Sequence, residues 1–171
     1  MTWETELACS GCNTTETVHA SGSKASPILF MGAHPGEDEL KKGIPFSGSS
    51  GGIMRTELGR MGVDLSRIRM CNLWLHTPNK NEKCFQAGLV YALKECKGRK
   101  LIVLIGSEPV KYFCDVSVEA YSGLVVTSTL LGTNAVIMAC IQPANVFKGT
   151  VGEVRLSLSK IAQKIEEMKL L

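Results

Sequence analysis

The sequence lacks any long uninterrupted hydrophobic run. Its apolar stretches end after a handful of residues, as at residues 101–105, whereas about 20 apolar residues are needed to cross a bilayer. We therefore predict no membrane span and no membrane partner. The N-terminal residues, which read MTWETE, lack both the positive start and the apolar stretch of a secretory signal peptide. From this we expect the protein to stay in the cytoplasm.

The sequence also has little excess charge of one sign. Its 19 lysine and arginine residues outnumber the 16 acidic residues only slightly, which permits an anionic partner such as DNA without requiring one. Charged residues make up 20% and hydrophobic residues 44% of the chain, the balance of a folded protein rather than of a disordered segment. We find no internal repeat. Residues 1–171 are therefore expected to form one domain.

Cysteine, by contrast, is abundant. Seven cysteines in a chain without an export signal favour metal ligands or buried thiols over a disulfide framework. Cys9 and Cys12 form a C-x-x-C unit, which tends to bring two sulfur atoms within reach of one metal. We interpret residues 1–27 as an N-terminal segment that carries metal ligands. Four other cysteines lie in or beside apolar patterns and are predicted to be buried structural thiols: Cys71, Cys96, Cys114 and Cys140.

Short apolar runs alternate with segments of helical periodicity along the chain. The runs predict buried strands at residues 28–31, 68–73, 101–105 and 135–140, with a further strand at 124–128. The periodic segments predict helices at residues 50–61, 81–96, 108–113 and 152–168. This alternation is typical of an α/β fold, here a three-layer α/β/α arrangement around a mainly parallel sheet of four to five strands. Ligands of such sheets bind at the carboxyl ends of the strands.

Two turns follow the first predicted strand, at residues 32–36 and 43–48, separated by a charged segment that we interpret as a linker. Glycine and proline let the backbone turn sharply over the strand end. The adjoining serine- and glycine-rich stretch offers backbone N–H groups to an anion, so Ser47 and Ser49 are candidate contacts to a phosphate group, which would belong to DNA if the resemblance described next holds. The alternative is a solvated loop without a ligand.

These loops carry a resemblance to a known family. The pattern Gly-x-x-Pro-Gly at residues 32–36, an acidic stretch, and Gly-x-Pro-Phe-x-Gly at residues 43–48 resemble the first motif region of uracil-DNA glycosylases, especially the iron–sulfur families four and five. Asn72 ends the second strand where that superfamily carries a uracil-reading asparagine. Residues 141–144 stand where it usually carries His-Pro-Ser. The departures indicate a divergent branch, with a viral source as one option, in which case the compartment is the host cytoplasm.

The resemblance implies a pocket for a flipped uracil, because the glycosidic bond is out of reach inside a duplex. Phe46 would stack on the base, and the Asn72 amide would donate to O4 and accept from N3–H. Gly32 would line the same pocket. Taken separately, a phenylalanine in the position of Phe46 is more often a core aromatic, and an asparagine in the position of Asn72 is more often a capping residue.

Two departures from the family concern the chemistry itself. Family four usually carries a glutamate where this chain has Ala33. Other branches place their water-positioning residue at the next position, so we assign that role to His34. Gln142 replaces the histidine that would stabilise the departing uracil anion, although a glutamine still offers an N–H donor. The chain therefore has two interpretations: a uracil-DNA glycosylase, or a catalytically silent DNA-binding or replication-complex subunit.

The segment after Gln142 is a candidate DNA contact. Superfamily members push an apolar side chain from this region into the space that a flipped base leaves, and Phe147 is suited to that task. Lys148 beside it would meet a phosphate. The alternative is a loop that caps a helix or faces the core. The resemblance implies uracil-containing DNA, single- or double-stranded, as the partner, and a replication or repair protein is a further candidate.

The resemblance also completes a metal site. It implies four ligands, namely Cys9, Cys12, His76 and Cys84, in which an imidazole replaces one of the family's thiolates. A four-iron, four-sulfur (4Fe-4S) cluster is favoured, with zinc as the alternative. Cys71 would replace His76 if the loop folded differently.

Overall fold

The computed structural model describes Cys12 and residues 16–171. Within this part of the chain, five strands form one sheet in the order β2-β1-β3-β5-β4. The strands are β1 (Ile28–Gly32), β2 (Arg69–Asn72), β3 (Leu101–Ile105), β4 (Val125–Val126) and β5 (Val136–Cys140). All pairings are parallel except that of β4, which joins the edge of β5 antiparallel. This confirms the mainly parallel sheet that the sequence predicted.

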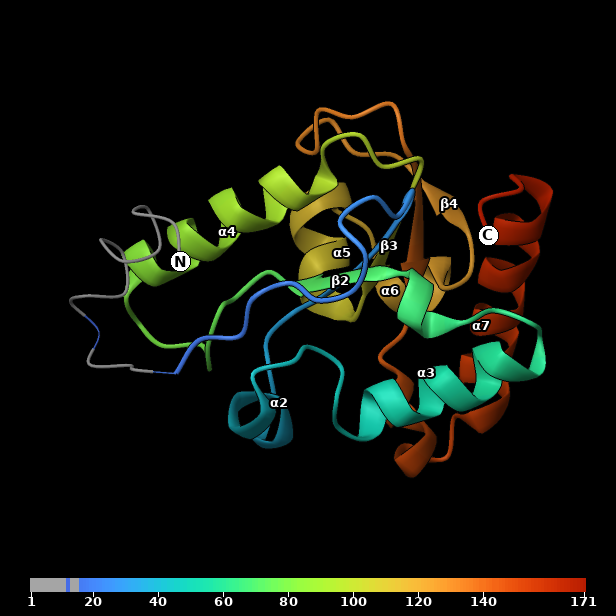
Figure 1. The fold of residues 1–171 in the computed structure, drawn as a ribbon, viewed down its shortest axis with the longest axis horizontal. Helices are drawn as coiled ribbons and strands as arrows, with labels where there is room; N and C mark the ends of the chain where they lie inside the picture. Colours follow the sequence, from blue (N-terminus) through green and yellow to red (C-terminus); the bar gives the residue numbers. More distant parts are fainter. Residues whose placement is uncertain (1–11, 13–15) are drawn as a thin grey trace.

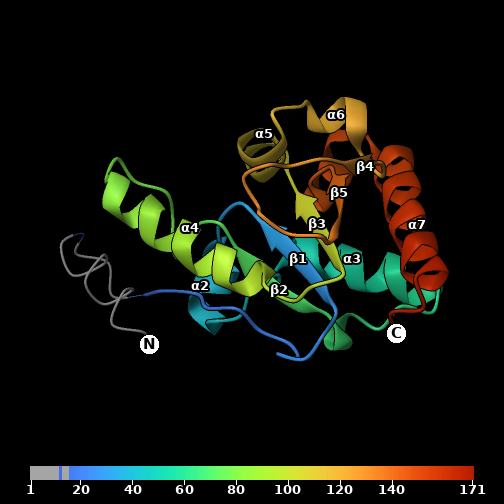
Figure 2. The same ribbon diagram turned by 90° about the horizontal axis from the view of Figure 1, so that it is seen from above.

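Helices cover both faces of the sheet. They are α2 (Glu37–Lys42), α3 (Ser49–Arg60), α4 (Glu82–Cys96), α5 (Ser107–Cys114), α6 (Val118–Tyr121) and α7 (Val151–Glu167), with short 3-10 helices η1 (Leu65–Arg67) and η2 (Pro143–Lys148). Figures 1 and 2 show α4 and α5 on one face and α3 and α7 on the other, which confirms the three-layer α/β/α fold. None of the helices in the described residues has the length and hydropathy to span a membrane.

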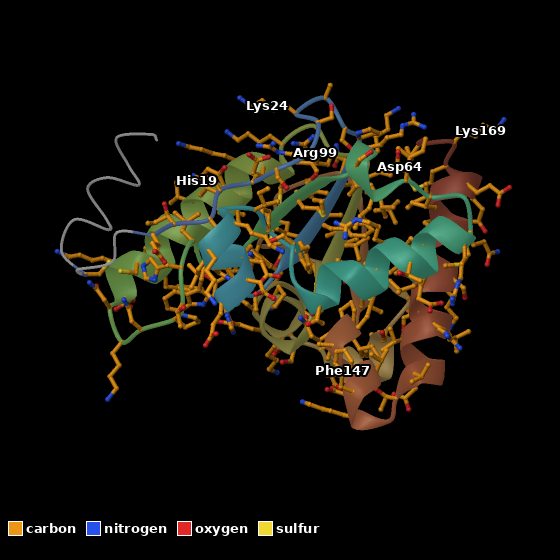
Figure 3. All side chains as sticks on the ribbon, turned by 60° about the horizontal axis from the view of Figure 1, so that its bottom comes forward. His19, Lys24, Asp64, Arg99, Phe147 and Lys169 are labelled. Carbon is orange, nitrogen blue, oxygen red and sulfur yellow. The ribbon has the colours of Figure 1, made fainter. Side chains whose placement is uncertain are left out.

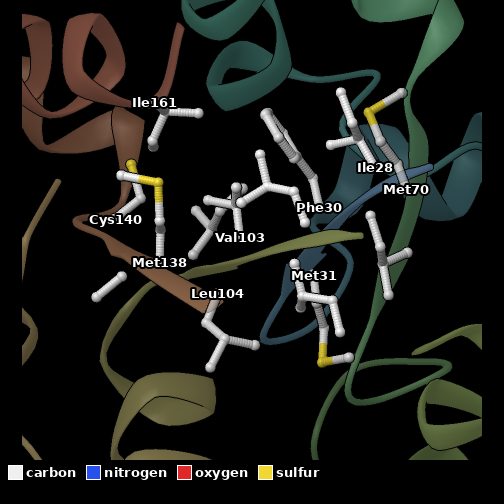
Figure 4. Close-up of a cluster of buried hydrophobic side chains, with 14 of the residues drawn as sticks. Ile28, Phe30, Met31, Met70, Val103, Leu104, Met138, Cys140 and Ile161 are labelled. Atoms are coloured by element: carbon white, nitrogen blue, oxygen red, sulfur yellow. The ribbon is translucent and has the colours of Figure 1, made fainter. Parts of the chain in front are cut away.

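The core lies on both sides of β1 and β3, which are buried along their whole length. Strands that are covered on both faces are apolar throughout rather than alternating in polarity. Their side chains still alternate in direction: Figure 4 shows Phe30 and Val103 on the same side as Ile161 of α7, and Met31 and Leu104 on the opposite side. This packing holds the ends of the central strands in fixed positions.

The charged segment after the first strand, which we interpreted as a linker, is the short helix α2. It buries none of its residues, so it has no apolar stripe for a sequence pattern to reveal. Acidic residues occupy its first turn and lysines its last, which suits the helix dipole. Gly43 ends it with φ 68°, a left-handed conformation that glycine adopts readily.

The strand predicted at residues 124–128 is shorter than expected, since β4 contains only Val125–Val126.

An ion-pair network lies at the amino end of β2, which we call the arginine end. Arg69 donates two hydrogen bonds to the two carboxylate oxygens of Glu95 on α4, at 2.8 and 2.7 Å. Arg99 donates a third at 3.1 Å. Burial raises the pKa of Glu95, but the hydrogen bonds and charges of the two arginines outweigh it, so that the pKa is lowered overall. The arginines also bind backbone carbonyls, Arg69 that of Gly22 and Arg99 that of Ser26.

Candidate active site

A cavity of about 520 Å³ opens at the other end of the sheet, which we call the cavity end. Gly32 and Asn72, the last residues of β1 and β2, line it together with Gly106 after β3 and Gln142 after β5. Parallel strands point the same way, so their carboxyl ends meet at one edge and leave a crevice for a ligand. The strand ends that the sequence singled out therefore share one cavity.

Phe46 and Asn72 meet over Gly32. Both side chains are buried, with 5% and 4% of their surface exposed, and both line the cavity. A Cβ atom added to Gly32 would lie 2.6 Å from Asn72 Oδ1 and 2.8 Å from Phe46 Cζ. Any side chain at position 32 would therefore displace the ring and the amide. The structure brings together the three residues that the resemblance assigns to the base.

The backbone of Phe46 adopts a left-handed conformation with φ 56°. For a residue with a bulky side chain this costs about 1–2 kcal/mol, so the surrounding structure must hold it. Gly51 of α3 does so: a Cβ atom there would lie 1.5 Å from the Phe46 carbonyl oxygen. The helix thus packs directly on the peptide group that follows the Phe46 Cα and fixes the direction of its ring.

His34 lies at the rim of the cavity and is exposed to solvent. Its Nδ1 is 3.1 Å from the carbonyl oxygen of Pro35. In the tautomer that donates this hydrogen bond, Nε2 keeps a lone pair that accepts a proton or a hydrogen bond from water. Ala33 beside it also lines the cavity and contributes only a methyl group.

Gln142 enters the cavity from the end of β5. Its Nε2 donates to Ser50 Oγ at 3.0 Å, and its Oε1 would lie 3.2 Å from a Cβ atom on Gly106. A primary amide has two N–H groups, so the bond to Ser50 orients the side chain and leaves one donor for a ligand.

Four carboxylates line the cavity that the sequence analysis did not assign: Glu37, Asp38, Glu39 and Glu108. Glu39 Oε1 accepts the backbone N–H of Gly48 at 3.0 Å and so ties α2 to the start of α3. Glu108 Oε1 accepts the indole N–H of Trp74 at 2.8 Å. The sequence signal for Glu108 was its position just after the third predicted strand, but the residue is equally expected in the first turn of a helix.

The candidate DNA contacts lie in different surroundings. Ser49 lines the cavity, whereas the hydroxyl of Ser47 donates to the Ile44 carbonyl at 2.8 Å and closes the turn. Phe147 of η2 is 75% exposed, and Figure 3 shows it at the edge of the molecule opposite Lys24 and Arg99. Lys148 beside it is also exposed. Phe147 therefore does not face the core.

Three of the four predicted metal ligands lie together. The ligand atoms of Cys12, His76 and Cys84 are within 4.8 Å of one another, and Cys12 Sγ is 3.7 Å from His76 Nε2. His76 Nδ1 lies 2.8 Å from the Thr77 carbonyl oxygen. Donation of this N–H fixes the tautomer whose Nε2 lone pair faces the sulfur, an arrangement typical of metal-binding histidines. Cys9 lies outside the described residues.

The other described cysteines lie outside this group. Cys71, the alternative to His76, is buried in β2 and is not among the grouped ligands. Burial raises its pKa well above the ordinary value, and raises those of Cys96 and Cys140 to about 12. These three thiols are therefore protonated at neutral pH and inert as nucleophiles. Cys114 is half-buried.

The family model of the uracil DNA glycosylase superfamily matches residues 19–165, which include every cavity residue described above. The chain belongs to the uracil-DNA glycosylase superfamily. It is 28% identical over 117 residues to a type-4 uracil-DNA glycosylase of Thermotoga maritima, a match that covers 63% of this chain and 61% of that protein. It is 29% identical over 90 residues to a type-4 uracil-DNA glycosylase of Archaeoglobus fulgidus, which covers 46% of this chain and 45% of that protein. The chain thus spans less than two thirds of the length of either relative.

Proposed function

We propose that this member of the uracil-DNA glycosylase superfamily excises uracil from DNA by hydrolysis of the N-glycosidic bond. The observation that carries the proposal is the meeting of the Phe46 ring and the Asn72 amide over Gly32, inside a cavity at the strand ends. The similarity to two type-4 uracil-DNA glycosylases supports it. Residues 1–171 would act as one unit.

Base recognition in this proposal separates affinity from selectivity. Stacking on Phe46 contributes about 1–3 kcal/mol but tolerates every base. Asn72 therefore supplies the selectivity against cytosine, because its amide both donates to O4 and accepts from N3–H of uracil, whereas cytosine presents the opposite pattern at these atoms. Burial of Asn72 strengthens this selection, since a wrong base would leave polar groups unpaired away from water.

Bond cleavage develops positive charge on the sugar and negative charge on the departing uracil. His34 would orient the attacking water through its Nε2. Gln142 would donate its remaining N–H to the uracil oxygen, and its bond to Ser50 Oγ at 3.0 Å supports this orientation. An amide is a weaker partner for the anion than a histidine, so cleavage is expected to be slower than in enzymes that carry one.

DNA binding would use the surface around the cavity mouth. Phe147 would fill the space left by the flipped base, and Lys148 would bind a phosphate. Ser49 would contact the backbone of the target strand. For Ser47 the hydrogen bond to Ile44 supports a role in shaping the loop, with its backbone N–H as the contact to DNA. A replication or repair protein remains a proposed partner.

The ligand group fits a metal centre, because two thiols and one imidazole are soft donors that suit iron–sulfur clusters and zinc alike. With Cys9 as a fourth ligand, Cys12, His76 and Cys84 would hold the 4Fe-4S cluster that the family resemblance implies. When bound, the group would link residues 1–27 to the loop after β2 and to α4. Zinc is the second candidate, since a separation of 3.7 Å between Cys12 Sγ and His76 Nε2 is compatible with two ligands of one tetrahedral ion, which lie about 3.5–3.8 Å apart.

An excision assay tests the proposed activity. Single-stranded and double-stranded oligonucleotides with one uracil are incubated with the protein and then treated with alkali, with cytosine in the same position as the control. We expect alkali-sensitive breaks at uracil only, and their loss in His34→Ala. The absence of breaks with stoichiometric protein, while the protein still binds the DNA, would instead establish the silent DNA-binding subunit that Ala33 and Gln142 suggest.

The metal centre has its own test. Iron, sulfide and zinc are quantified in protein purified without oxygen, and a visible spectrum is recorded. A cluster gives a brown protein with sulfur-to-iron charge-transfer absorbance, and His76→Cys is expected to retain it. Stoichiometric zinc without iron would identify zinc, and not a cluster, as the bound metal. The absence of both metals would reject the site.

A further inference from the structure

Glu108 is a carboxylate fixed inside the cavity by a single neutral donor. It is the second residue of α5 and half-buried, and its Oε1 accepts the Trp74 indole N–H at 2.8 Å. Among the residues that the structure describes, no other group binds this carboxylate. Since a carboxylate offers a second oxygen, Glu108 presents an unused acceptor and a negative charge to the cavity.

Trp74 connects Glu108 to Ala33, the position at which family four usually carries a glutamate. The backbone N–H of Trp74 donates to the Ala33 carbonyl at 2.8 Å, and its ring packs on Phe85 with the ring centroids 5.1 Å apart. The indole is thus held from two sides. The carboxylate that it orients reaches the cavity from α5, beside the wall to which Ala33 contributes only a methyl group.

The other cavity carboxylates are less suited to chemistry. Glu39 is half-buried like Glu108, but its carboxylate links α2 to the start of α3 through the Gly48 N–H at 3.0 Å, so its direction is set by the packing of the loop. Glu37 and Asp38 are exposed on α2, where water screens their charge. Glu108 is half-buried, is held in direction by the side chain of Trp74, whose backbone binds Ala33, and is not neutralised by a cation among the described residues.

We propose that Glu108 supplies the carboxylate of the cleavage reaction, in place of the glutamate that Ala33 replaces. The inference rests on the proposed excision of uracil. The C1′–N1 bond breaks and its electron pair leaves with uracil, while the fixed negative charge of Glu108 stabilises the positive charge on the sugar. The oxygen of the water that His34 orients then bonds to C1′. Glu108 takes the proton that this water releases, and the proton passes through solvent to the uracil anion, which restores the carboxylate.

Glu108→Gln tests this role, because glutamine keeps the shape and the acceptor for Trp74 but removes the charge. We expect the single-turnover excision rate to fall about 10²–10³-fold. Affinity for DNA that contains 2′-fluoro-deoxyuridine, which resists cleavage, is expected to stay within roughly twofold. Glu37→Gln, which removes an exposed carboxylate from the same cavity, is the matched control and is expected to leave the rate within roughly twofold.

Trp74→Phe supplies the second arm, since it removes the N–H that orients Glu108. It is expected to slow excision about tenfold in the wild-type background and to add nothing to Glu108→Gln. A wild-type protein that does not cleave would overturn the proposed function and this inference together. A cleaving wild type whose Glu108→Gln variant keeps its rate, or loses rate and affinity equally, would overturn the inference alone. Urea unfolding of each variant shows whether it is folded under the assay conditions, so that the excision rates of folded proteins are compared.

Discussion

The two ends of the sheet each hold a half-buried carboxylate, in contrasting ways. At the arginine end, Glu95 accepts three hydrogen bonds from Arg69 and Arg99, so its charge is paired and both oxygens are used. At the cavity end, Glu108 accepts one hydrogen bond from a neutral indole. Breaking a buried pair is costly because it leaves the partner charge unpaired, whereas an unpaired carboxylate in a cavity is available for a ligand. The comparison separates a stabilising acid from a reactive one.

The backbone follows the same division. At the arginine end, side chains saturate loop carbonyls, including those of Gly22 and Ser26, and thereby fix the segment before β1. At the cavity end, Gly32 has no side chain and so leaves space beside the Phe46 ring, and Phe46 itself adopts a left-handed backbone conformation. The arginine end thus binds its loops through charged side chains, whereas the cavity end holds a residue with a strained backbone, Phe46.

The largest effect is expected from Asn72→Ala at the cavity end. Without the amide, O4 and N3–H of uracil have no hydrogen-bond partner, and we expect the excision rate to fall by about 10³-fold or more. The free energy of unfolding is expected to change by less than about 1 kcal/mol, because the amide faces a cavity rather than a packed core. Single-turnover kinetics and urea titration measure the two quantities. A variant that loses stability but keeps its excision rate would show that Asn72 stabilises the fold and does not select the base.

Glu95→Gln is expected to show the opposite behaviour. Two arginines would lose their counter-charge, so the free energy of unfolding should fall by about 3 kcal/mol, with the excision rate of the folded protein unchanged. Glu57→Gln is the matched control, since Glu57 pairs with Arg60 and Arg155 at 3.0 and 3.3 Å but both arginines are largely exposed. Its loss should stay below about 1 kcal/mol. Equal losses in the two variants would contradict the distinction.

The pH dependence of the free energy of unfolding tests whether Glu95 stabilises the fold through its charge. The pKa of Glu95 is lowered in the folded protein from 4.5, so its contribution is fully present above that pH and is lost as the pH falls through the lowered value. We expect the urea midpoint of the wild type to fall more steeply below pH 4.5 than that of Glu95→Gln. Parallel profiles would show that the network does not stabilise the fold through charge.

Phe147→Ala is expected to have the smallest effect. With 75% of its surface exposed, Phe147 contributes little to packing, so the free energy of unfolding should change by less than about 0.5 kcal/mol. Excision from double-stranded DNA is expected to slow about tenfold, equivalent to ~1.4 kcal/mol, because no side chain would fill the space of the flipped base. Single-stranded DNA serves as the control, and equal slowing on both substrates would argue against the wedge.

Much of the fold followed from local pattern. The central strands are uninterrupted apolar runs, and the predicted strand at 101–105 coincides with β3. Because parallel strands end at one edge, the strand pattern predicted that a ligand binds there, whereas the assignment of Gly32 and Asn72 to one pocket came from the family resemblance. The proximity of His76 to Cys12 came from the family resemblance rather than from spacing, since 64 residues separate them.

Three features were not revealed by the sequence, because each either has no periodic pattern or depends on tertiary contacts. Helix α2 has no buried side chain and therefore no periodic signal. Glu108 has the pattern of an ordinary first-turn acid, and only packing brings the Trp74 indole, 34 residues away, to its carboxylate. The left-handed backbone of Phe46 is likewise imposed by the close approach of Gly51, which no local propensity encodes.

The single hydrogen atom that Gly32 carries in place of a side chain has a consequence for how such a protein changes over time. One methyl group there would occupy the space between Phe46 and Asn72, whereas Cys12, His76, Cys84 and Phe147 are not among the groups that it would meet. A change of this one codon is therefore expected to block the proposed uracil slot without the loss of any chemically reactive residue.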